Sequence, residues 1–253
     1  MVRTKRIGNI EKYIYINKTV TLDQLCEEFK VSKNTIRRDI DELASKGLVK
    51  KIYGGVTIPD TQSMKPFEER SISNLGLKQY IAKKAASLVN DGEIIFIDSG
   101  TTTFPMVEFI QKKNITILTN NIEVIIKCIP HNNINVISLS GILDRKALSF
   151  TGSTAVDVLQ QYNISKAFLA ATGISSKNGA TNSSPAETAI KKTAIERSVK
   201  KYLLVDHTKF EVSSLVTYAQ FDKLDAIITD QYPDKELEHA ILSAGCEIIL
   251  ADS

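Results

Sequence analysis

Hydrophobic positions in the first 30 residues follow helical spacing. One apolar stripe predicts a helix at about residues 4–16, and it consists of Ile7, Ile10 and Ile14. A second helix is expected after Thr21, which fits a capping box with Gln24 because each side chain can bond the backbone N–H of the other residue. Its apolar face comprises Leu22, Leu25, Cys26 and Phe29.

A third helix is predicted from Ser32 onward, because its hydroxyl can accept a backbone N–H of the first helical turn. The buried face of this helix consists of Ile36, Ile40 and Leu43. Lys30 and Val31 turn the chain between the second and third helices. Two short helices joined by such a turn form a helix-turn-helix.

The polar face of the third helix has residue types that can read DNA. An arginine, such as Arg37 or Arg38, can bind guanine O6 and N7, and an asparagine, such as Asn34, can bind adenine N6 and N7. The amino-terminal part of a recognition helix is where a helix-turn-helix meets base edges. The alternative is a solvated face on which Arg37 or Arg38 pairs with Asp41.

A β-hairpin is predicted at residues 48–56, after Gly47 ends the third helix. Gly54 and Gly55 give its tight turn, so the segment reads as the wing of a winged helix-turn-helix. Its polar side chains suit either a phosphate backbone or water. The predicted DNA-binding residues are Thr21, Ser32, Lys33, Asn34, Thr35, Arg37, Arg38, Lys50, Lys51, Tyr53 and Gly54.

A linker is predicted between two domains, because residues 58–78 lack periodicity and contain Pro59, Pro66 and Gly76. This places a DNA-binding domain at residues 1–57 and a larger domain at 79–253. Phe67 is unusual in a tether. It either docks on the second domain and carries a signal, or simply anchors an ordered linker.

From residue 80 onward, short apolar runs alternate with helical stretches. The runs are 93–97, 115–118, 135–139, 167–171, 202–205, 226–228 and 247–250. This alternation predicts the α/β class, with a mainly parallel sheet covered on both faces. In such sheets ligands bind beyond the carboxyl ends of the strands.

Polar clusters follow several of these runs. In the first, residues 98–103, Gly100 permits close backbone approach and the next helix start offers free N–H groups to an anion. The pattern is neither GxGxxG nor a P-loop, so no nucleotide is implied, and a capped turn is the simpler alternative. Five such clusters together suit a small polyhydroxylated, phosphorylated ligand.

The predicted effector-binding residues come from these clusters and from one helix. They are Asp98, Ser99, Gly100, Thr101, Thr102, Thr103, Thr119, Asn120, Asn121, Gly141, Gly152, Gly173, Glu187, Lys191, Asp206 and Lys209. Glu187 and Lys191 stand one helical turn apart, so a solvated ion pair is the alternative for those two.

Composition narrows the class of protein. Residues 1–58 hold 12 basic and 7 acidic residues, a net charge of +5, whereas the remainder holds 20 and 22, a net charge of −2. This asymmetry suggests that the first part contacts a polyanion. The three cysteines are far apart and lack metal-ligand spacing, so no metal or cofactor is expected. No signal peptide or membrane span is recognisable, and we expect a cytoplasmic protein.

The run from Thr21 through VSKNTIRRDIDELASKGLVKKIYGGV resembles the DNA-binding head of the DeoR-type bacterial transcription regulators. The resemblance continues in FIDSGTTT, in Thr119–Asn120 and in the run from Asp206 to Phe210. It implies a winged helix-turn-helix that reads duplex DNA, and an effector domain that is similar to ribose-phosphate isomerases and binds a phosphorylated sugar. It also implies a homodimer or homotetramer.

Within that family the chain is most similar to repressors of inositol catabolism, on stretches such as YNISKAF and HTKFEVSSLVTYAQFD. The implied inducer is a phosphorylated deoxy-keto-gluconate. An alternative is a sugar-phosphate isomerase with a DNA-binding head. Such isomerases carry an acidic DGxDE run, but the corresponding stretch 167–173 has no carboxylate, so we expect no enzyme.

Overall fold

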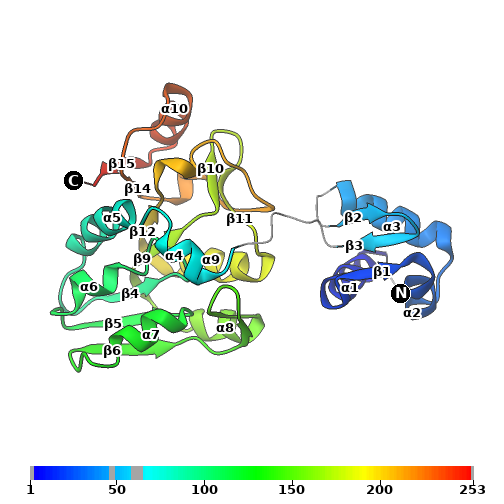
Figure 1. The fold of residues 1–253 in the computed structure, drawn as a ribbon, viewed down its shortest axis with the longest axis horizontal. Coiled ribbons are helices and arrows are strands. Elements are labelled where there is room, and N and C mark those ends of the chain that lie inside the picture. The colour runs from blue at the N-terminus through cyan, green and yellow to red at the C-terminus, as the bar shows by residue number, and fades with distance from the viewer. Residues whose placement is uncertain (1–2, 46–48, 58–64, 252–253) are drawn as a thin grey trace. The chain divides into compact units, whose positions relative to one another are not determined.

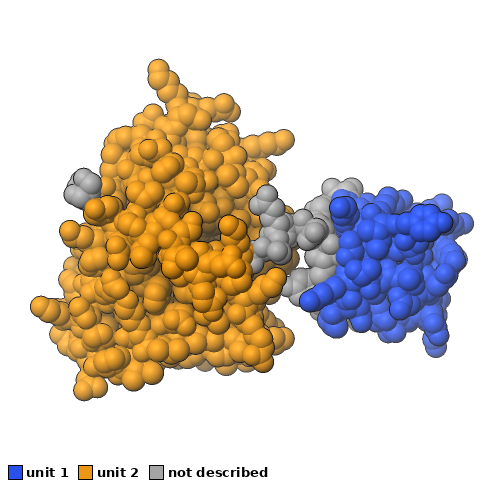
Figure 2. Space-filling view, in the orientation of Figure 1, with its two compact units in different colours: residues 1–63 blue, residues 64–253 orange. Residues whose placement is uncertain are grey.

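The chain forms two compact units, residues 1–63 and residues 64–253, coloured separately in Figure 2. The structure is a computed structural model that describes residues 3–45, 49–57 and 65–251. Each unit has a hydrophobic core of its own. The two units are therefore described one at a time.

The first unit contains the three predicted helices, α1 (Arg3–Asn17), α2 (Leu22–Phe29) and α3 (Lys33–Ser45). A hairpin of β2 (Lys50–Ile52) and β3 (Gly55–Thr57) forms the predicted wing (Figure 1). β1 (Thr19–Thr21) pairs with β3 and was not predicted, because only Val20 of its three residues is buried. The predicted helix end at Gly47 lies outside the described residues.

The second unit is built on a seven-stranded sheet in the order β15-β14-β12-β9-β4-β5-β6, with every neighbouring pair parallel (Figure 1). Its strands are β4 (Ile94–Ile97), β5 (Ile115–Thr119), β6 (Ile134–Ser138), β9 (Ile164–Ala170), β12 (Ser198–Leu204), β14 (Ala226–Thr229) and β15 (Glu247–Leu250). The predicted α/β class is confirmed, and each of the seven apolar runs became a strand.

Helices cover both faces of this sheet, as the uniformly apolar strands predict. Ile95 and Ile97 pack on one face with α5 (Leu75–Ser87), α6 (Met106–Ile110) and α7 (Ile122–Cys128). Phe96 points to the other face, which α8 (Ser153–Leu159), α9 (Pro185–Arg197) and α10 (Lys235–Ser243) cover. The alternating directions of side chains along β4 thus feed two separate cores.

Short antiparallel strands follow the carboxyl ends of several main strands and were not predicted. β7 (Ile142–Asp144) pairs with β8 (Ser149–Thr151), and β11 (Gly179–Asn182) lies between β10 (Gly173–Ser175) and β13 (Val216–Ala219). Two 3₁₀ turns, η1 (His207–Lys209) and η2 (Phe221–Lys223), complete the unit. The short strands are only three or four residues long, which is too short for a recognisable alternating pattern.

Helix α4 (Phe67–Ile72) and the start of α5 occupy a stretch for which the sequence suggested a linker. Phe67 is buried, its ring meets that of Phe104 edge to face at 5.7 Å, and its N–H donates to the carbonyl of Lys146 at 2.8 Å. Phe67 is therefore anchored in the second unit, as both alternatives required, and a role in carrying a signal stays a prediction. Residues 58–64 of the expected linker lie outside the described residues.

Among the described residues, no helix combines the length and the apolar character that crossing a bilayer requires.

Candidate functional site

Helix α3 presents most of its predicted DNA-reading residues to the surface. Lys33, Asn34, Arg37 and Arg38 are exposed, and Thr35 is half-buried. The helix begins as predicted, because the Ser32 hydroxyl accepts the N–H of Thr35 at 3.3 Å. Ile36, Ile40 and Leu43 lie in the core beneath.

The capping box at the start of α2 is also confirmed. The Thr21 hydroxyl accepts the N–H of Gln24 at 3.1 Å, and the Gln24 amide oxygen accepts the N–H of Thr21 at 2.8 Å. The hydroxyl of Thr21, predicted to contact DNA, thus already has a role in helix capping. Its membership of a DNA-binding surface stays a prediction.

Two lysines of the predicted surface have carboxylate partners within the first unit. Lys51 on the wing pairs with Asp41, and Lys33 pairs with Asp23 at 2.5 Å. Asp41, weighed from the sequence as a partner of Arg37 or Arg38, thus contacts the wing. Lys50, Tyr53 and Gly54 are exposed, with Gly54 in the turn at φ +73°.

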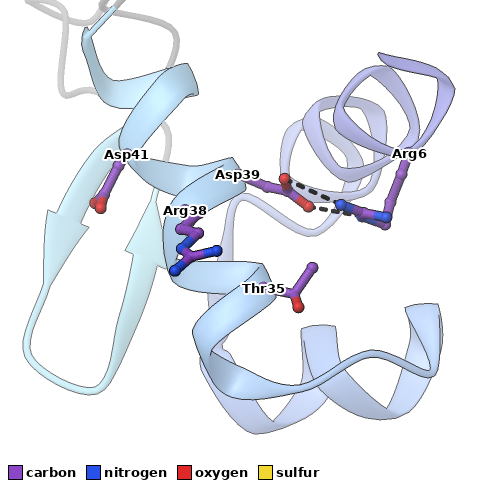
Figure 3. A pocket seen from close by; sticks show the side chains of 5 residues that line it. All are labelled: Arg6, Thr35, Arg38, Asp39 and Asp41. Carbon is purple, nitrogen blue, oxygen red and sulfur yellow. Dashed lines mark hydrogen bonds and ion pairs between the residues drawn. The ribbon is translucent and has the colours of Figure 1, made fainter. Parts of the chain in front are cut away.

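Asp39 is a functional candidate that the sequence pattern did not single out. Its side chain is only 1% exposed, and both of its oxygens accept bonds from Arg6 of α1, at 2.7 and 3.3 Å (Figure 3). This hydrogen bond raises the pKa of Arg6. A signal was available, because Asp39 stands three residues after Ile36 and therefore falls on the buried face of α3.

An open hollow of about 400 Å³ lies beside α3 (Figure 3). Its lining combines one hydroxyl, two guanidinium groups and two carboxylates, from Arg6, Thr35, Arg38, Asp39 and Asp41. The ion pair of Arg6 and Asp39 therefore lies next to Thr35 and Arg38, two of the predicted DNA-binding residues.

In the second unit, the strand order reverses between β4 and β9, which is where ligands bind in open α/β sheets. Asp98 follows β4 and is 1% exposed, and its Oδ2 accepts the N–H of Ala170 at 3.0 Å. A Cβ on Gly100 would lie 2.2 Å from the Cβ of Ala170. The first polar cluster thus packs directly on the end of β9.

Lys191 joins this cluster from α9. Its buried ammonium contacts Asp98 Oδ2 and donates to the carbonyl of Ala170 at 2.9 Å. It also lies 5.4 Å from the ring centre of Tyr218, whose pKa burial raises well above its ordinary value. The alternative of a solvated Glu187–Lys191 pair does not hold, because both side chains are buried and Lys191 pairs with Asp98.

Glu187 accepts bonds from neutral donors on three other segments. The hydroxyls of Ser99 and Ser149 reach Oε1 at 3.1 and 3.3 Å, and the Asn182 amide reaches Oε2 at 3.1 Å. Ser149 was not predicted, since it lies on a short strand that the pattern did not reveal. Asn182 stood in one of the polar clusters but was not included in the predicted set. The carboxylate therefore ties together the loop after β4, β8, β11 and α9.

Several predicted site residues have backbone roles in the structure. Thr103 donates to the carbonyl of Gly100 at 2.8 Å, and Thr119 donates to that of Ile97 at 2.7 Å. A Cβ on Gly141 or Gly173 would lie 2.3 or 2.2 Å from a backbone oxygen, and Gly152 precedes α8 at φ +103°. Thr101 and Thr102 are buried in the loop after β4.

Four buried side-chain atoms have no hydrogen-bond partner in the part of the chain that the structure describes. They are Asn120 Oδ1, Asn121 Nδ2, Thr188 Oγ1 and Asp206 Oδ2. Three of them belong to predicted site residues just beyond β5 and β12. A buried polar atom without a partner is costly, so these atoms mark places where a polar ligand would bond.

The structure adds two cations that sequence reasoning missed. Lys78 of α5 is 4% exposed and donates to the carbonyl of Arg70 at 2.5 Å. Burial lowers its pKa to about 8, Asp206 acts in the opposite direction, and the cations Lys209 and Arg70 lower it further. Both residues fell in the presumed linker, because the helix that follows it was predicted to begin only at Ile81, whereas α5 begins at Leu75.

Arg70 of α4 lies near the carboxylates of Glu187 and Asp98. Burial lowers its pKa, and the carboxylates of Glu187 and Asp98 act against that shift. Its Nε donates to the carbonyl of Lys65 at 3.0 Å. The carboxyl edge of the sheet thus combines cations suited to an anion with carboxylates and amides suited to hydroxyls. Among the described residues, no group of three metal-ligating side chains is found.

Comparison with known proteins places this geometry in a family. The model of the DeoR C terminal sensor domain matches residues 73–231, and that of the DeoR-like helix-turn-helix domain matches residues 6–62. The chain belongs to the DeoR family of transcription regulators. The resemblance drawn from the sequence is confirmed.

Relatives of this DeoR-family chain align along most of its length. The HTH-type transcriptional regulator IolR of Bacillus subtilis (strain 168) is 44% identical over 93% of this chain and 94% of its own. The lactose phosphotransferase system repressor of Streptococcus mutans is 33% identical over 98% and 100%. These relatives are transcription regulators rather than enzymes, in agreement with the expectation that this DeoR-family chain is no isomerase.

Solved structures with a related fold include ribose 5-phosphate isomerase A from Neisseria gonorrhoeae. It is 18% identical, with a TM-score of 0.40 over 54% of this chain and 53% of that one. At these values the likeness supports no statement about the ligand of this DeoR-family chain.

Proposed function

We propose that the chain is a transcriptional repressor that is released from its operator by a phosphorylated sugar or sugar acid. In this proposal the first unit reads duplex DNA, and the second binds the effector at the carboxyl edge of its main sheet. The observation that carries the effector half is the unpartnered Oδ2 of Asp206, buried near Lys78 and Lys209.

The DNA half is supported by the surface of the first unit. Exposed Arg37, Arg38 and Asn34 stand in the first turns of α3, which is where a recognition helix meets base edges. Lys50 and Lys51 lie on the adjacent wing, where they can reach phosphates. Two base-reading arginines and flanking lysines fit specific binding better than a general attraction to polyanions.

The effector half is supported by the mixture of charges. Arg70, Lys78 and Lys209 supply cations for a phosphate. The helix start expected directly after Gly100 is absent, because residues 101–105 form turns and α6 begins only at Met106. Asp206, Glu187 and Asn120 have acceptor atoms for hydroxyl groups. A ligand that is both anionic and rich in hydroxyls satisfies both kinds of group.

The specific effector that we propose is a phosphorylated deoxy-keto-gluconate from inositol catabolism. The support is the 44% identity to the regulator IolR, spread over 93% of the chain. The lactose phosphotransferase system repressor of Streptococcus mutans aligns with 98% of the chain at 33% identity, so likeness along the whole chain does not by itself select the sugar.

We further propose that the repressor acts as a homodimer or homotetramer on a pseudo-palindromic operator. Two-fold symmetry in the protein then matches two-fold symmetry in the DNA. The effector acts by binding one arrangement of the second units more tightly, which shifts the population away from the arrangement that binds DNA.

The test begins with a duplex selected from a random-sequence pool by the full chain. Thermal melts then screen 6-phosphogluconate, fructose 6-phosphate, gluconate and the phosphorylated deoxy-keto-gluconate. A compound that binds only the folded state raises the melting temperature. The proposal expects a phosphorylated compound to do so and to release the selected duplex.

Two results would contradict the proposal. If no sequence is enriched from the pool, the chain is not an operator-binding protein. If gluconate shifts the melting temperature as much as the phosphorylated compounds, the phosphate is not what the cations recognise. Interconversion of an aldose and a ketose phosphate by the purified protein would revive the isomerase alternative.

A further inference from the structure

We propose that the ion pair between Arg6 and Asp39 positions the recognition helix α3 and thereby sets the preference of the chain for its operator over other DNA. The inference rests on the proposed function, because α3 is taken to meet base edges. Asp39 and Arg6 are not themselves proposed to touch DNA.

The geometry of the pair is directional. Arg6 reaches Asp39 through two of its nitrogens, Nε at 2.7 Å and a terminal nitrogen at 3.3 Å. A two-bond contact of this kind fixes the relative orientation of the groups that it joins. Since Arg6 belongs to α1 and Asp39 to α3, the contact limits rotation and sliding of α3 against α1.

Helix α3 also has the ion pairs of Lys33 with Asp23 and of Asp41 with Lys51, but both are exposed to water and contribute little. Its contacts with the core are not directional. Ile36, Ile40 and Leu43 are buried in an apolar cluster that α1 and α2 also enter. Apolar packing is proportional to the area buried and does not select one orientation of the helix strongly. The ion pair, in which Asp39 is buried and Arg6 partly buried, therefore adds an orientation that the apolar face alone leaves less well defined.

The pair also lies where orientation matters. Asp39 directly follows Arg38, and both line the same hollow as Thr35 and Arg6 (Figure 3). Base recognition demands that side chains be held within about 0.5 Å of the productive geometry. A small rotation of α3 moves Arg38 and Thr35 away from base edges while phosphate contacts, which tolerate displacement, persist.

The experiment replaces both members of the pair in the full chain, as Arg6→Met with Asp39→Leu. Removing one cation and one anion leaves the net charge unchanged, so the general attraction to DNA is preserved. Replacing a buried ion pair by apolar side chains is often neutral or stabilising, so the variant is expected to fold. The probes are the duplex selected by the wild-type chain and a random duplex of equal length.

We expect the ratio of the two dissociation constants to fall at least tenfold, because selected-duplex binding weakens while random-duplex binding stays within threefold. The salt dependence on random DNA should not change. A matched control, Lys127→Met with Glu108→Leu, removes a net-neutral ion pair from the second unit and should retain the wild-type ratio.

A second variant, Arg6→Lys, keeps the charge but loses the two-bond geometry, and should lower the ratio by an intermediate factor. Arg6→Lys also provides a test of the inference if the double variant has too low a melting temperature for binding measurements. An unchanged ratio in a folded double variant, or in Arg6→Lys, overturns the inference. Failure of the wild-type chain to select any sequence overturns the proposed function instead.

Discussion

Four ionisable side chains at one edge of the main sheet are shielded from water. Asp98, Glu187, Lys191 and Asp206 are each at most 5% exposed. Asp98 and Lys191 neutralise one another, but Glu187 bonds to neutral donors and one oxygen of Asp206 has no partner among the described residues. Folding alone gives no reason to bury such groups, whereas binding a polar ligand does.

Lys78 offers a test of this interpretation through pH. Its pKa of about 8 in the folded chain lies below the ordinary 10.5, so the unfolded state binds more protons between these values and stability rises with pH there. We expect Lys78→Met to melt above the wild type at pH 7, with an advantage that shrinks at pH 9.5. Thermal melts at both pH values measure this difference.

The same variant tests anion binding. Asp206, Lys209 and Arg70 are the charged groups around Lys78, and a bound phosphate would add negative charge that holds the ammonium protonated. Lys78→Met should therefore lose most of the melting-temperature rise given by the effector found in the screen. Because the variant is expected to be stable without ligand, a normal rise would remove Lys78 from the site.

The arginines of α3 are tested by comparing two duplexes. Arg38→Ala should lose at least ~1 kcal/mol on the selected duplex and less on a random one, because a bidentate guanine contact is specific to the base. Lys50→Ala should instead weaken both and lower the salt slope by about one, as a lost phosphate contact does. Equal losses on both duplexes for Arg38→Ala would leave it as a phosphate contact only.

At the scale of elements, the strands and helices of both units follow from apolar periodicity. Each apolar run of the second unit became a strand, and Thr21 and Ser32 begin helices through the bonds expected of them. The short antiparallel strands were not predictable, since three residues of β8 or β10 show no period. For the same reason the sequence did not single out Ser149 of β8, which contacts Glu187 only because the fold brings them together.

The close packing of Gly100 on the end of β9 predicts that adding a methyl group there, as in Gly100→Ala, destabilises the chain. A Cβ on Gly100 would lie 2.2 Å from the Cβ of Ala170, so Gly100→Ala forces the loop away from the end of β9. We expect a loss of about 1–3 kcal/mol in unfolding free energy, as for other overpacked sites. Denaturant titration measures it, and Gly76→Ala, where nothing lies within 4 Å, is the control.

At the scale of the molecule, the chain has separate cores in its two units. One apolar cluster lies in residues 7–56 and two lie on the faces of the main sheet. Charge asymmetry and the change of pattern near residue 80 suggested two units. The sequence pattern did not show that α4 belongs to the second unit. Phe67 of α4 is buried there against Phe104, which is distant in sequence.

This division predicts the behaviour of a truncated chain. A fragment of residues 65–253 retains α4, both cores of the sheet and every proposed effector residue. It should fold cooperatively and show the same effector-dependent rise in melting temperature as the full chain, without binding the selected duplex. A rise reduced by more than half would mean that the first unit contributes to the effector site.

The bond from the Lys78 ammonium to the carbonyl of Arg70 fastens α5 to α4, and α4 begins ten residues after the wing ends. A bound anion would compete with the Arg70 carbonyl for this ammonium. Effector binding would therefore weaken the hydrogen bond between α5 and α4, which is close in sequence to the DNA-binding unit. Substitutions of Ser71 or Ile72 in the last turn of α4, which leave Arg70 in place, should then change the inducer concentration that releases the operator without altering the proposed DNA-binding or effector-binding residues. That makes this turn a natural place to build biosensors with graded thresholds.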